Sequence, residues 1–199
     1  MSEALDLYRR IADGFSARLK AVAAGAWDTP TPCPGWTAGY VPVHVVGVGR
    51  SYLAVAGGGP VPPALDAYVA DMAARGESSA AAAGGGVAAF ELLRAEAEAA
   101  LEDPARVVAP VQTPFGELPL AAVISVVMGG DMLAHTWDLA RAVGGDERLD
   151  PEACEAILGA WRPLDEALRA PGVCGPRIAV PDDADPSARF LGFVGRDVV

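Results

Sequence analysis

Apolar residues recur at helical spacing along most of the chain. In the first segment they fall three or four positions apart, at Leu5, Tyr8, Ile11, Phe15, Leu19 and Val22. This spacing predicts an amphipathic helix with Ser2 as its N-cap. A second helix is predicted from Val41, Val45, Val48, Tyr52 and Val55. Thr37 would cap it, and the glycines that begin at Gly57 would end it. Between the two helices, residues 29–36 hold three prolines within five positions and predict a rigid extended loop.

Two further long helices are predicted beyond residue 75. One is Ala-rich and follows a short helix at 63–75; its apolar face is carried by Phe90, Leu93, Ala97 and Leu101. The glycines at 84–86 mark a weak point in this helix or its true start. The most apolar segment, 120–143, ends at Gly144, with Arg141 where the helix dipole favours a cation.

The remaining segments are shorter. Residues 106–111 alternate too briefly to separate a strand from an extended loop, and 113–119 predict a turn. A fifth helical stretch at 151–169 is expected to kink at Pro163, and Asp185 opens a final short helix. No repeats or long linkers interrupt the chain, so we expect one domain over 1–199. Four long amphipathic helices with almost no strand predict an all-α antiparallel bundle, whose second and third helices need not pack in sequence order.

Charge and composition exclude several classes of function. The chain has 15 Lys+Arg against 26 Asp+Glu and a formal net charge of −11, so it lacks the cationic excess that binds nucleic acid or anionic membrane. No uninterrupted apolar stretch approaches the ~20 residues that span a bilayer, and the first residues lack the features of a secretory signal. We therefore expect a cytoplasmic protein with neither nucleic-acid nor membrane partners.

Three scattered cysteines, Cys33, Cys154 and Cys174, form no Cys-x-x-Cys pair and are expected to be thiols. Cys33 lies in a tight Pro-Cys-Pro-Gly-Trp turn. It is either a reactive thiol or a buried small apolar residue, and the second interpretation is favoured.

The chain has only two histidines, and both lie on helices with apolar faces. Asp131 and His135 are four residues apart, so their side chains project side by side and can each give one ligand to a single ion. His44, on another helix, is the available third ligand. The spacing alone is common; it equally fits a side-chain pair within one helix or a core histidine satisfied by a backbone carbonyl.

Other polar and aromatic residues have two interpretations each. Trp137 and Asp138 lie about 200° and 300° around the helix axis from His135. This favours interhelix packing for Trp137, and a cap or salt bridge for Asp138 over a hydrogen bond from the imidazole. Three further tryptophans are expected in core and lid packing: Trp27, Trp36 and Trp161. Three arginines could receive a carboxylate of a small-molecule thiol, although solvated ion pairs are the default: Arg50, Arg141 and Arg196.

Two segments carry a family resemblance. Thr31-Pro-Cys-Pro-Gly-Trp-Thr37 and His135-Thr-Trp-Asp-Leu-Ala-Arg-Ala142 resemble the DinB/YfiT-like metal-binding superfamily, in particular the actinobacterial branch that contains the metal-binding domain of mycothiol-dependent maleylpyruvate isomerase. Residues 185–197 are similar to the C-terminal signature of small single-domain members. The resemblance implies an up-down-down-up four-helix bundle, here with extra short helices, and one divalent metal held by His44, Asp131 and His135.

The chain departs from that branch in two ways. The isomerase has Glu where this chain has Asp131, one methylene shorter, so the carboxylate must come from a closer backbone, bind through water, or only hydrogen-bond a ligand. The isomerase also has an additional C-terminal domain that contributes to its active site. A chain of 199 residues leaves no room for it, which argues against maleylpyruvate isomerisation.

Two imidazoles and one carboxylate leave coordination positions open for water or substrate. We expect zinc in a tetrahedral site, with nickel or iron as alternatives at higher coordination number. A thiol or water at an open position would be deprotonated, and no further acid or base is required.

Three hypotheses follow. The first is a metal-dependent thiol transferase or isomerase that activates a small-molecule thiol such as mycothiol for addition to an electrophile. The second is a noncatalytic metal- or small-molecule-binding bundle. The third is a decayed site, which a separation of more than about 8 Å between His44 and His135 would support. A homodimer through an exposed helix face stays open, because no heptad seam requires one.

Overall fold

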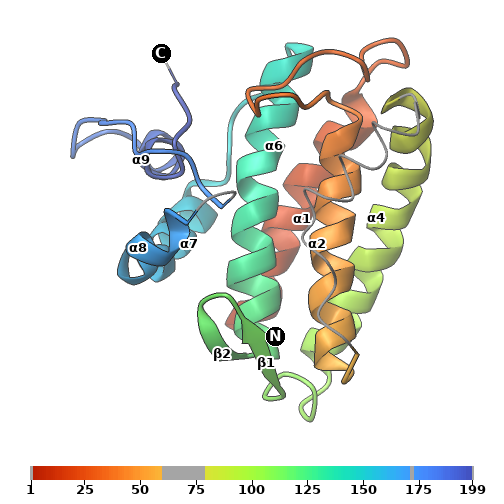
Figure 1. Ribbon diagram of the computed structural model, residues 1–199, viewed down its shortest axis with the longest axis vertical. Coiled ribbons are helices and arrows are strands. Elements are labelled where there is room, and N and C mark those ends of the chain that lie inside the picture. The colour runs from red at the N-terminus through yellow and green to blue at the C-terminus, as the bar shows by residue number, and fades with distance from the viewer. Residues whose placement is uncertain (1, 60–78, 171–172, 199) are drawn as a thin grey trace.

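The computed structural model describes residues 2–59, 79–170 and 173–198, with the backbone alone for 79–84. Four long helical segments form a bundle, and a small hairpin closes one end (Figure 1). The bundle helices are α1 (Glu3–Ala21), α2 (Tyr40–Ala56), α4 (Ser79–Glu102) and α6 (Gly129–Val143). The short helix predicted at 63–75 lies outside the described residues.

The direction of the four helices gives an all-α, DinB-like bundle. Figure 1 shows α1 and α6 running one way and α2 and α4 the other, which is the up-down-down-up order. Helix α1 packs against α6 and α4, while α2 packs against α4. The implied fold is therefore confirmed.

The predicted apolar faces form the core. All five apolar residues of the α1 stripe within the helix are buried, and so is the predicted face of α4. Phe15 of α1 and Phe90 of α4 meet edge to face, with ring centroids 4.8 Å apart. The glycines at 84–86 lie within α4. Gly86 is buried, and a Cβ built there would lie 3.1 Å from Pro42 of α2, so its small size permits close helix packing.

The apolar segment Leu120–Val143 is one continuous helical stretch with a local widening. It consists of α5 (Leu120–Ala122), the π-helical η1 (Val123–Met128) and α6, and it ends at left-handed Gly144. By length and composition it could cross a membrane, but 78% of its most apolar window is buried within the bundle, as in a core helix.

The ends of the other elements correct some predictions. Ser2 and Asp185 cap their helices as expected, but α2 has Gly39 at its N-cap, and the buried hydroxyl of Thr37 has no hydrogen-bond partner among the described residues. The turn predicted at 113–119 is the second half of a hairpin, β1 (Pro110–Thr113) with β2 (Gly116–Pro119).

The C-terminal third packs beside the bundle. Its helical segments are α7 (Pro151–Trp161), the 3-10 turn η2 (Arg162–Leu164), α8 (Asp165–Leu168) and α9 (Pro186–Phe193). The 3-10 turn contains Pro163 and interrupts the predicted helix there, because proline removes a backbone donor. Helix α7 contacts α1, α6 and α9, so this part of the chain is joined to the bundle through α7.

Gly130 lies on α6 where this helix packs against Trp161 of α7. A Cβ at Gly130 would lie 2.2 Å from a ring carbon of Trp161, whereas a Cβ at Gly159 on α7 meets nothing within 4 Å. We predict that Gly130→Ala lowers the free energy of unfolding by about 1–3 kcal/mol, because the overpacked ring must move. Gly159→Ala should be neutral or stabilise by up to about 1 kcal/mol. Urea unfolding of both variants checks this; equal effects would contradict the packing argument.

Candidate metal centre

The three predicted ligands meet in one place. Nε2 of His44 lies 3.1 Å from Oδ1 of Asp131, and Nε2 of His135 lies 3.5 Å from the same oxygen. All three ligand atoms lie within 4.8 Å of one another, and the two imidazole centroids are 4.7 Å apart. We call these residues the three-ligand cluster. The short separation of the two rings contradicts the geometry expected of a decayed site.

The spacing of the cluster fits a small divalent ion. Two ligand atoms about 2.1 Å from a tetrahedral zinc are separated by about 3.4 Å. The distances of 3.1 and 3.5 Å from Oδ1 of Asp131 to the two imidazole nitrogens bracket that value. Asp131, although shorter than Glu, therefore reaches both imidazoles directly. Its side chain is 27% exposed, against 13% for His44 and 8% for His135, so the cluster opens to solvent on the carboxylate side.

Two helices position the ligands. His44 lies in the second turn of α2, and Asp131 and His135 lie one turn apart on α6. The π-helical η1 ends just before α6, and π-bulges shift the register of the residues that follow. Such a shift is one local means of turning Asp131 and His135 toward α2.

The ionisation of each residue in the three-ligand cluster depends on its charged neighbours. Burial opposes ionisation of Asp131, but the neighbouring His44 and His135 outweigh it and hold the pKa of the carboxyl well below its usual range. Burial likewise disfavours the charged form of His135, yet Asp131 and Asp138 raise its pKa well above the ordinary value. Both carboxylates thus favour the protonated form of His135. A metal bound at its Nε2 would displace one proton.

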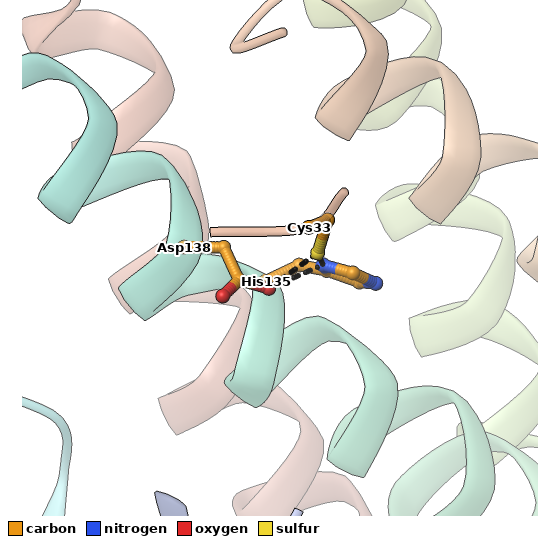
Figure 2. Close-up of side chains that lie close together, drawn as sticks. All are labelled: Cys33, His135 and Asp138. Atoms are coloured by element: carbon orange, nitrogen blue, oxygen red, sulfur yellow. Dashed lines mark hydrogen bonds and ion pairs between the residues drawn. The ribbon is translucent and has the colours of Figure 1, made fainter. Parts of the chain in front are cut away.

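A second group of residues lies at the other nitrogen of His135. Nδ1 is 2.9 Å from Oδ2 of Asp138, and the Cys33 sulfur lies 3.2 Å from that oxygen (Figure 2). Arg196 donates to both Asp138 oxygens, at 2.7 and 3.2 Å. Burial opposes ionisation of the fully buried Asp138, but His135 and Arg196 hold the pKa of this carboxyl well below its usual range. We call Cys33, Asp138 and Arg196 the Asp138 cluster.

The proline-rich loop brings two side chains to His135. The amide of Trp36 donates to the carbonyl of Cys33 at 3.0 Å, and Gly35 between them has φ +79°. Pro at the second and Gly at the third position are the residues of a type II β-turn, since only Gly readily takes that φ. Trp36 then stacks on His135, with centroids 5.4 Å apart, and contacts His44 at 4.7 Å.

Several sequence predictions need correction here. Asp138 accepts from the imidazole, contrary to the favoured interpretation, because 300° around a helix is 60° in the other direction and residues i and i+3 are neighbours. The expected salt bridge is also present, with Arg196, but it is buried rather than solvated. Cys33 is half-buried beside charged groups rather than in an apolar site.

The other aromatic predictions are confirmed. Trp137 is buried, with Arg141 over its ring at 5.3 Å, and Trp161 packs in the core. Trp36 packs against the rings of His44 and His135. The signal that could have located Cys33 and Trp36 at one site was the Cys-Pro-Gly-Trp turn, which brings its first and fourth residues together.

Comparison with known proteins gives a consistent family match. A family model described as the mycothiol maleylpyruvate isomerase N-terminal domain matches residues 8–140. Two uncharacterized proteins of Mycobacterium tuberculosis, from strains CDC 1551 / Oshkosh and ATCC 25618 / H37Rv, are each 31% identical over 193 residues. The matched region covers 96% of this chain and 96% of each relative. No solved structure matches the chain.

The buried charge of Asp138 gives a stability prediction. Arg196→Met should lower the free energy of unfolding by about 3 kcal/mol, because it removes the guanidinium that pairs with a buried carboxylate. Arg148→Met is the control: Arg148 pairs with Asp146, but its side chain is 89% exposed, so we expect little change in the free energy of unfolding. Urea unfolding without metal measures both. A loss no larger for Arg196→Met than for the control would contradict the prediction.

Proposed function

Since the chain belongs to the family of the mycothiol maleylpyruvate isomerase N-terminal domain, we propose that it is a divalent-metal-binding protein that acts as a thiol transferase or isomerase of the mycothiol type. The observation that carries the proposal is the convergence of His44, Asp131 and His135, whose ligand atoms lie within 4.8 Å of one another. Zinc fits this donor set best, because two imidazole nitrogens and one carboxylate oxygen are ligands that it favours.

The residues around the cluster have complementary roles. His44, Asp131 and His135 hold the ion, which when bound supplies the Lewis acidity that makes a thiol or water nucleophilic at neutral pH. Trp36 covers both imidazoles and keeps water from that side. Asp131, the most exposed of the three, leaves an approach for a small-molecule thiol and its electrophile on the carboxylate side.

Metal binding is the first test. We predict that the purified protein, reconstituted with zinc, binds one ion per chain, and that Asp131→Asn lowers its zinc affinity at least about tenfold, since a neutral amide is a much poorer ligand. The control is Asp13→Asn, whose carboxylate is 68% exposed on α1 and pairs with Arg94. Isothermal titration calorimetry with zinc gives both values. A wild-type protein that binds no zinc, or equal affinities for both variants, would contradict the assigned site.

Thiol activation is the second test. In cobalt-substituted protein, mycothiol should change the visible spectrum of the metal, and the zinc protein should accelerate its conjugation to an electrophile such as a maleyl compound. Asp131→Asn should reduce both effects. Metal binding with no spectral response to mycothiol would favour the alternative, a noncatalytic metal- or small-molecule-binding bundle, over the enzyme.

A further inference from the structure

Asp138 is the most enclosed charged group beside the three-ligand cluster. Its side chain has no exposed surface, and its Oδ2 accepts from Nδ1 of His135 at 2.9 Å and from Nη2 of Arg196 at 2.7 Å. Oδ1 accepts from Nε of Arg196 at 3.2 Å. The guanidinium therefore engages both oxygens, which fixes the plane of the carboxylate.

Arg196 is itself anchored by the end of α9. Its amide donates to the carbonyl of Leu191 at 2.8 Å, and its Nη1 donates to the carbonyl of Val194 at 3.0 Å. The preceding Gly195 has φ +82°, and a Cβ there would lie 2.7 Å from the carbonyl oxygen of Pro176. Only Gly fits this close approach. The backbone conformation at Gly195 and Arg196 thus fixes the position from which the guanidinium contacts Asp138.

Cys33, Asp138 and His135 also resemble a second metal site, but the position of Arg196 argues against metal binding there. Ligand atoms of Cys33, His135 and Asp138 lie within 4.8 Å of one another and could hold an ion. However, Nη2 of Arg196 is 2.7 Å from Asp138 and 3.4 Å from the Cys33 sulfur, so a cation already occupies this position. A second ion would have to displace a buried, bidentate guanidinium.

We propose that Arg196 is a positioning residue for the three-ligand cluster and acts through Asp138. With Arg196 in place, the fixed carboxylate accepts from Nδ1 of His135, so the proton of the neutral ring stays on Nδ1 and the lone pair of Nε2 faces His44 and Asp131. This inference rests on the proposed metal site. The C-terminal segment, which lies outside the family match at 8–140, then sets the metal affinity of ligands that it does not itself provide.

His44 offers an internal contrast. Its Nδ1 is buried and has no hydrogen-bond partner among the described residues, whereas Nδ1 of His135 has Asp138. The tautomer of His135 is therefore the one that the Asp138 cluster controls. Because the chain contains only two histidines, the two rings can be followed separately by nitrogen NMR.

A double-mutant cycle on zinc affinity tests the proposal in the full-length protein. Asp138→Asn and Arg196→Met should each weaken zinc binding by about 10–100-fold, measured by competition with a chromogenic chelator. If Arg196 acts through Asp138, the double variant should bind zinc no more weakly than Asp138→Asn alone. Arg189→Met is the matched control, because Arg189 lies on α9, shortly before Arg196 in the chain, and pairs with Glu155 rather than with Asp138; it should bind zinc as wild type does.

Nitrogen-15 histidine NMR of the zinc-loaded protein is the second measurement. It reports on the His135 ring directly, and a general loss of stability would not change its signal. The wild-type spectrum should show a protonated Nδ1 on the His135 ring. In Arg196→Met the signal of this N–H should shift or broaden through exchange with solvent, because the carboxylate that accepts from it is no longer fixed. If Arg196→Met does not fold, Arg196→Lys replaces it. This variant keeps the charge but loses the two-pronged contact, so its zinc affinity should lie below that of wild type.

The possible failures are distinguishable. A wild-type protein that binds no zinc overturns the proposed function. Normal zinc binding by the wild type, with unchanged affinity and an unchanged signal of the His135 Nδ1–H in the folded Arg196 variant, overturns the positioning role alone. Additive losses in the double variant would also overturn it, because Arg196 would then act independently of Asp138.

Discussion

His135 is shared by two sets of charged groups, and the rest of the site depends on this arrangement. One ring nitrogen faces Asp131 and the other faces Asp138, and both carboxylates lie close enough to raise the pKa of the ring. A buried imidazole between two carboxylates is tolerated only if each charge has a partner. His44, Arg196 and either a proton or a metal ion supply those partners.

This requirement links parts of the chain that are far apart in sequence. His44 comes from α2, His135 and both carboxylates come from α6, and Arg196 follows α9. The proline-rich loop places Cys33 near Nδ1 of the same ring and stacks Trp36 on that ring. The apolar bundle keeps these segments at fixed distances. The geometry of the site is therefore set by ordinary helix packing. Its chemistry comes from a few polar residues that face one another.

The main features of the fold could be predicted from the sequence, because long helices with continuous apolar faces leave few packing alternatives. The three-ligand cluster could also be proposed, since Asp131 and His135 are one turn apart and His44 was the available third ligand. The Asp138 cluster could not. Arg196 is 58 residues from Asp138, and no periodicity links them. Asp138 itself was underestimated because its angle around the helix was measured in one direction only. The hairpin at 110–119 was too short for its alternation to identify it.

The central claim is that one divalent ion binds between His44, Asp131 and His135. Anomalous diffraction at the zinc absorption edge, from crystals of the zinc-reconstituted protein, tests it most directly. The account predicts a single strong peak about 2.0–2.2 Å from Nε2 of His44, Nε2 of His135 and an oxygen of Asp131. A peak at Cys33 and Asp138, with Arg196 displaced, or no peak within the bundle at saturating zinc, would contradict it.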